Sequence, residues 1–123
     1  PTALPRSVST SQVFSCKTLV HSVASAAGED FAVIRLDRPV THTAPLLYRR
    51  QGRINPGEPL FVVGHPAGLP MKISGGASVR EVKPEFLVAN LDTYGGNSGS
   101  AVFHSVDGKI EGILVRGEMD YTF

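Results

Sequence analysis

The chain has 123 residues, and its 12 Lys and Arg nearly balance its 11 Asp and Glu, which leaves a formal net charge of +1. This length suits a single domain, and the scattered basic residues exclude the positive patch typical of nucleic-acid binding. No apolar run approaches membrane-spanning length. The sequence also lacks the charged start followed by an apolar core that would indicate a signal peptide. Cys16 is the only cysteine, so we expect no internal disulfide and no Cys-based metal site. Nothing else in the sequence leads us to expect a metal or an organic cofactor.

The first half of the chain predicts two strands. Residues 1–12 are rich in Ser, Thr and Pro and indicate a flexible lead, and alternating residues over 13–23 predict the first strand. A loop of small residues over 25–30 precedes a second strand at 31–37, which Pro39 ends. The Pro- and Gly-containing residues 42–58 predict a linker.

The second half predicts further short strands and no helix. Asp107-Gly108 between two alternating apolar runs is a strong hairpin signal. The predicted strands cover 60–64, 72–82, 85–91, 100–105 and 109–115, with a turn at 66–70. Short strands at this spacing, with 13 Gly and 9 Pro, indicate an all-β barrel or sandwich.

The segment Asp92-Thr93-Tyr94-Gly95-Gly96-Asn97-Ser98-Gly99-Ser100 is the most informative stretch for function. Glycines let the backbone take a positive φ and pass close to a ligand, so the amides of Gly96 and Ser98 could be aimed at one point. Two such amides beside a serine hydroxyl are the geometry that stabilises an oxyanion during acyl transfer. A glycine-rich hairpin turn accounts for the same residues equally well.

The second informative segment begins with Glu29-Asp30 and runs through Phe31-Ala32-Val33-Ile34-Arg35-Leu36-Asp37. It places the carboxylate of Asp30 at the mouth of an alternating strand. The alternative is an acidic residue that merely ends a loop.

Together these segments resemble the trypsin-like, chymotrypsin-fold serine peptidases, in the Gly-Asn-Ser-Gly form of the bacterial V8-like branch. Phe61-Val62-Val63-Gly64-His65-Pro66-Ala67-Gly68 and Glu111-Gly112-Ile113-Leu114-Val115-Arg116-Gly117 resemble that branch's second-barrel turn and substrate-binding strand. The match runs from about Val13 to Tyr121. The resemblance implies an incomplete chymotrypsin-like double β-barrel. It would comprise a lead at 1–12, a remnant of the N-terminal barrel at 13–41, a linker at 42–58 and most of the C-terminal barrel at 59–123.

The resemblance also implies catalytic roles. Ser98 would be the nucleophile, Asp30 the acid that orients the base, and the amides of Gly96 and Ser98 the oxyanion donors. The family's Thr-Ala-Ala-His-Cys-like motif is missing from this sequence, and none of its four histidines has the family spacing. Because triad members act as a unit, we expect this chain alone to be inactive, with its histidine base on a segment that the chain lacks.

Pocket residues follow from the same resemblance. Asp92 matches the position at the base of the pocket for the side chain before the cleaved bond, where a carboxylate would select Arg or Lys. Alternatively, Asp92 ends a strand and bonds turn amides. Leu114 stands where glutamate-selecting members have histidine, and Thr93 could line the pocket. The backbone of Val115, Arg116 and Gly117 would pair with an extended substrate.

Two rival hypotheses remain for the sequence. A non-catalytic relative could bind peptides or partner proteins in the same cleft, or the Gly-Asn-Ser-Gly turn could occur by chance in a structural β domain. The expected partners are a peptide or protein substrate and either the missing N-terminal segment or another copy of the chain, because incomplete barrels leave strand edges exposed. Nucleic acid and membrane are not expected as partners, and the family resemblance implies a secreted or periplasmic location.

Overall fold

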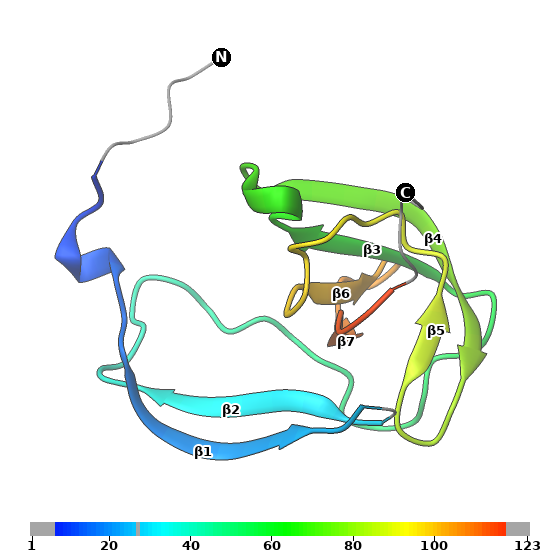
Figure 1. Cartoon of the computed structure of the whole chain (residues 1–123), viewed down its shortest axis with the longest axis horizontal. Helices are drawn as coiled ribbons and strands as arrows, with labels where there is room; N and C mark the ends of the chain where they lie inside the picture. Colours follow the sequence, from blue (N-terminus) through cyan, green and yellow to red (C-terminus); the bar gives the residue numbers. More distant parts are fainter. Residues whose placement is uncertain (1–6, 27, 118–123) are drawn as a thin grey trace.

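The computed structural model describes residues 7–26 and 28–117, and these residues form strands and turns with two short 3₁₀ segments (Figure 1). The all-β prediction is therefore confirmed. The predicted lead at 1–12 and the C-terminal barrel at 59–123 each extend into residues outside the described ranges. The elements are η1 (Thr10–Gln12), β1 (Cys16–Ala24), β2 (Asp30–Leu36), β3 (Pro59–Gly64), η2 (Pro66–Gly68), β4 (Lys72–Val82), β5 (Leu87–Ala89), β6 (Ala101–His104) and β7 (Ile110–Ile113).

Strands β1 and β2 form an antiparallel hairpin of their own. Its register pairs Ala24 with Asp30 beside the turn and Cys16 with Leu36 at the far end. No residue of either strand is buried. The hairpin lies apart from the larger sheet along most of its length in Figure 1 and approaches it at the turn between β1 and β2.

The other strands form one curled antiparallel sheet with the order β5-β4-β3-β6-β7 (Figure 1). Along β3, buried residues alternate with less buried ones, as expected for a strand with one face toward a core. Leu60 and Val62 from β3 meet Val79 from β4 and Val102 from β6 in that core. The curl of this sheet gives the molecule a half-barrel and positions the loop that follows β5.

The predicted linker packs against the five-stranded sheet. Tyr48 forms a parallel bridge with Ile110 of β7, and Ile54 is buried in the core cluster. Arg53 donates hydrogen bonds to the carbonyls of Lys83 and Pro84 at the turn between β4 and β5. Residues 42–58 therefore contribute to the core as well as connecting the two sheets. No helix among residues 7–26 and 28–117 has the length and apolar character to cross a membrane.

Candidate active site

A pocket of about 840 Å³ lies at the end of the five-stranded sheet where the serine loop is located. Three segments line it: the end of β3 with η2 and the start of β4, the loop before β6, and the residues after β7. Apart from Gly96, eight residues were predicted as catalytic or substrate-binding. Seven of them line the pocket, namely Asp92, Thr93, Ser98, Leu114, Val115, Arg116 and Gly117. Asp30 is the eighth and does not line it. Gly96, which was predicted only as a backbone donor, is also not among the lining residues.

The serine loop consists of two successive β-turns. The amide of Asn97 donates to the carbonyl of Tyr94 over 3.4 Å, and the amide of Ser100 donates to that of Asn97 over 2.9 Å. Gly96 and Gly99 each occupy the third position of a turn, with φ of 92° and 88°. These positive φ values favour glycine, so the predicted role of the glycines in shaping this loop is confirmed at these two positions.

The buried side chain of Asn97 holds the serine loop in place. Its Nδ2 donates to the carbonyl of Tyr94 over 3.2 Å. A Cβ atom on Gly64 would lie only 2.3 Å from Asn97 Oδ1 and from Ser100 Oγ. The absence of a side chain at Gly64 therefore lets the loop sit directly against the end of β3.

Ser98 is exposed at the corner of the second turn, where its Oγ donates to the carbonyl of Val115 over 3.3 Å. The amides of Gly96 and Ser98 donate to no group in the described part of the chain. Two amides without an acceptor beside an exposed serine hydroxyl remain available to an anionic oxygen of a ligand.

The residues after β7 fix the other side of the loop. Gly99 N donates to Leu114 O over 2.7 Å, and Leu114 N donates to Ser100 O over 2.9 Å. With the bond from the Ser98 hydroxyl to Val115, three consecutive residues of the serine loop are held by hydrogen bonds. The side chain of Arg116 points elsewhere, since it donates to the carbonyls of Ala26 and Gly28.

Asp92 is exposed in the pocket. Its backbone carbonyl accepts a hydrogen bond from Ser74 Oγ over 2.8 Å, whereas its carboxylate has no partner in the described ranges. Within the described residues, no turn amide donates a hydrogen bond to this carboxylate. Among residues 7–26 and 28–117, no group competes with a ligand cation for it.

No role was assigned from the sequence to the part of the pocket formed by η2 and the residues around it. Ala67 N donates to Gly95 O over 2.7 Å, and Ala67 has a φ of 50°, which is uncommon for a residue with a Cβ atom. The Gly-His-Pro-Ala-Gly turn carried the signal, since a residue near two glycines and a proline is expected in a tight turn. The lining residues not predicted from the sequence are Val62, Gly64, Pro66, Ala67, Leu69, Lys72, Ser74, Tyr94, Gly95 and Asn97.

Asp30 lies at the first position of β2, exposed and paired in register with Ala24. It lies two residues after Gly28, whose carbonyl accepts a hydrogen bond of 2.7 Å from Arg116. The segment that carries Asp30 therefore contacts the segment next to Ser98 through Arg116, although the two are far apart in sequence.

None of the four histidines lines the pocket that contains Ser98. His21 lies against the ring of Phe31, and His42 is stacked on Phe14 with a centroid separation of 6.0 Å. His65 adjoins the pocket, but its Nδ1 lies 3.1 Å from the carbonyl of Leu69. Neither these three nor His104 is among the residues that line the pocket.

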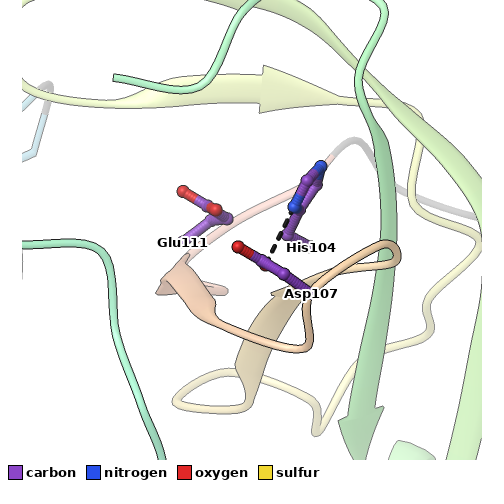
Figure 2. Close-up of side chains that lie close together, drawn as sticks. All are labelled: His104, Asp107 and Glu111. Carbon is purple, nitrogen blue, oxygen red and sulfur yellow. Dashed lines mark hydrogen bonds and ion pairs between the residues drawn. The ribbon is translucent and has the colours of Figure 1, made fainter. Parts of the chain in front are cut away.

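His104, Asp107 and Glu111 lie close together at the β6–β7 hairpin, with potential ligand atoms within 4.8 Å of one another (Figure 2). Their polar atoms already have partners. Glu111 accepts two hydrogen bonds from Arg49, at 2.6 and 2.8 Å, and this contact raises the pKa of Arg49. Asp107 pairs with Lys109 over 2.7 Å and with His104 over 2.9 Å. Arg49 and Lys109 already pair with the carboxylates of Glu111 and Asp107, so the arrangement is an ion-pair network rather than an open metal site.

Comparison with known proteins identifies the family. The family model of the trypsin-like peptidase domain matches residues 6–113, which is most of the chain. The chain belongs to this family, and its curled half-barrel sheet with a second sheet fits a partial chymotrypsin-like β-barrel domain. Neither the search of curated proteins nor that of solved structures found a match.

Proposed function

We propose that this chain is part of a serine endopeptidase that hydrolyses peptide bonds through an acyl-enzyme. Ser98 is the nucleophile, Asp30 orients the base, and the amides of Gly96 and Ser98 stabilise the oxyanion. The histidine base comes from a segment outside these 123 residues, so the chain alone is inactive. That segment, or another copy of the chain, would be its partner in the active enzyme.

One observation carries the proposal. The exposed hydroxyl of Ser98 lies on the wall of the pocket within a loop whose amides at positions 96 and 98 have no acceptor in the described residues. A glycine-rich hairpin with no chemical role has no need to expose a serine at a pocket of this size. Peptide hydrolysis needs this combination of a nucleophile, unpaired backbone donors and room for a substrate.

The pocket also supports a proposed substrate class. The free carboxylate of Asp92 would pair with the cationic side chain of Arg or Lys before the cleaved bond. The backbone of Val115, Arg116 and Gly117, which follows the end of β7, would bind the substrate backbone in an extended form. The Gly-Asn-Ser-Gly loop supports assignment to the V8-like branch, with a preference other than for glutamate because Leu114 lines the pocket.

A fluorophosphonate probe tests the nucleophile directly. We expect slow or no labelling of the chain alone, and labelling at Ser98 when the missing upstream segment is supplied or the full-length parent is used. Ser98→Ala should abolish labelling, whereas Ser105→Ala, a matched change in the exposed β6–β7 turn, should leave it unchanged.

Asp30→Asn tests the orienting acid, and Glu29→Gln at the adjacent position is its control. In the reconstituted enzyme, we expect Asp30→Asn to reduce kcat by up to the order of 10⁴-fold, because the base loses its preferred tautomer. Efficient peptide turnover by the isolated chain, lost in Ser98→Ala, would contradict the proposed inactivity. Labelling of the parent protein that is unaffected by Ser98→Ala would contradict the assignment of the nucleophile.

The bond from Ser98 Oγ to the carbonyl of Val115 favours a second candidate, a non-catalytic domain that binds peptides in the same cleft. A serine that donates to a carbonyl oxygen has no base in that contact to accept its proton. Peptide binding by the full-length protein without any fluorophosphonate labelling would favour this candidate.

A further inference from the structure

The guanidinium of Arg116 joins the two sheets beside the pocket. Its Nη1 donates to the carbonyl of Ala26 and its Nη2 donates to that of Gly28 over 2.7 Å. Both acceptors belong to the turn between β1 and β2, 90 and 88 positions earlier in the sequence. A planar guanidinium presents several donors in a fixed fork, which suits two carbonyls of one turn better than a single ammonium would.

The described residues of the turn that Arg116 contacts form hydrogen bonds with one another. Gly28 N donates to Ser25 Oγ over 3.1 Å, and Ser25 N donates to Glu29 O over 2.8 Å. Gly28 is buried, and a Cβ atom there would lie 2.4 Å from Glu85 Oε2. The turn is therefore in close contact with Arg116 and with the β4–β5 turn.

The other neighbour of Arg116 is the serine loop. Val115, the preceding residue, accepts the hydrogen bond from Ser98 Oγ, and Leu114 exchanges backbone hydrogen bonds with Gly99 and Ser100. A short path of contacts thus leads from Ser98 through Val115 to Arg116, and from Arg116 to the turn that ends at Asp30.

The β1–β2 hairpin has little else to fix its position. None of its strand residues is buried, and the described strands of the two sheets share no backbone ladder. A lone two-stranded hairpin is only marginally stable in water. The contacts at its turn therefore determine where Asp30 lies relative to Ser98.

We propose that Arg116 is a positioning residue that holds the Asp30 turn against the wall of the cleft. This inference rests on the proposed peptidase function for its catalytic consequence, but the structural link can be tested alone. It also gives the side chain of Arg116 a role separate from the backbone contact with substrate that the sequence predicts. Its side chain is engaged by the chain's own carbonyls, so only its backbone remains for the substrate.

A distance measurement between the two sheets tests the link without requiring catalysis. Cys16 is exposed at the far end of the hairpin, and Val106, which is 77% exposed in the β6–β7 turn, can be changed to Cys. With spin labels at both positions of the full chain, we expect one narrow distance distribution. Arg116→Ala should broaden it, Arg116→Lys should restore it in part, and Arg80→Ala on the exposed face of β4 should leave it unchanged.

The catalytic arm uses the labelling rate of Ser98 in the protein that contains the missing histidine segment. We expect Arg116→Ala to slow labelling on the order of 10- to 100-fold at an unchanged thermal midpoint, with partial recovery in Arg116→Lys. An unchanged distance distribution in Arg116→Ala would overturn the proposal. If the distribution broadens but wild-type Ser98 is never labelled, the link is supported and the proposed peptidase function fails.

Discussion

The two sheets of this chain differ in what stabilises them. Every buried hydrophobic side chain in the described ranges belongs to the five-stranded sheet or to Ile54, which packs on it. In the β1–β2 hairpin, by contrast, Leu19 and Val20 are 57% and 55% exposed. The hairpin depends on its own backbone ladder and on contacts at its turn, whereas the larger sheet has a core.

This difference separates the roles of the two regions in the proposed site. The sheet with the core carries the serine loop, which is fixed by hydrogen bonds to the end of β3 and to the residues after β7. The hairpin carries Asp30 on a region with much less burial. The nucleophile should therefore keep its geometry under conditions that displace the acid.

The strongest test of this contrast compares the same substitution in both sheets. Leu60 is 0% exposed in β3, so Leu60→Ala should cost about 2–5 kcal/mol of unfolding free energy through lost burial and the cavity left behind. Leu19→Ala in β1 should change it by no more than about 0.5 kcal/mol. Urea denaturation measures both values, and similar losses for the two variants would mean that the hairpin also has a core in solution.

A second test compares two glycines in the larger sheet. Gly64→Ala places a Cβ atom against Asn97 and Ser100, so we expect a loss of about 1–3 kcal/mol and a displaced serine loop. Gly75→Ala, for which no heavy atom lies within 4 Å of the new Cβ, should stay within about 0.5 kcal/mol of the wild type. Thermal unfolding gives the energies, and the amide NMR shift of Ser98 reports the loop. A normal Ser98 amide shift in Gly64→Ala would contradict the close fit.

Much of the larger sheet could be predicted from local pattern. The strand predicted at 72–82 has the bounds of β4, and the Asp-Gly signal predicts the β6–β7 hairpin. Local pattern overestimates β5, predicted at 85–91 but observed only at Leu87–Ala89, because β5 is an edge strand with a register shift against β4. The turns of the serine loop could also be predicted, since they depend on Gly96 and Gly99, which lie within the loop itself.

Contacts between distant segments could not be predicted in this way. Ile54 lies in a segment with no strand of its own, yet it is buried in the core. Arg116 was predicted to contribute backbone to substrate binding, but its side chain bonds a turn about 90 residues earlier. Hydrophobic periodicity describes a residue's neighbours along one element, so it contains no information about a partner on the other sheet.

The smallest predicted effect concerns pH and the ion pairs of the β6–β7 hairpin. The hydrogen bond from the Lys109 side chain, and to a smaller extent the one from His104, holds the pKa of Asp107 well below its ordinary value of 3.8. A carboxyl with a pKa lowered in the folded state adds stability that is complete above its unfolded pKa and is lost as the pH falls toward the folded pKa. Asp107 therefore contributes at neutral pH, and its contribution declines below about pH 4.

Asp107→Asn removes that contribution, so the difference in thermal midpoint between wild type and variant should be positive at about pH 6 and smaller at about pH 3. The side chains involved are partly exposed, so added salt should also reduce the difference. Because the turn lies in the sheet that has the core, this change should leave the spin-label distance to Cys16 unaltered. A midpoint difference that is independent of pH would show that Asp107 acts through its turn geometry and not through its charge.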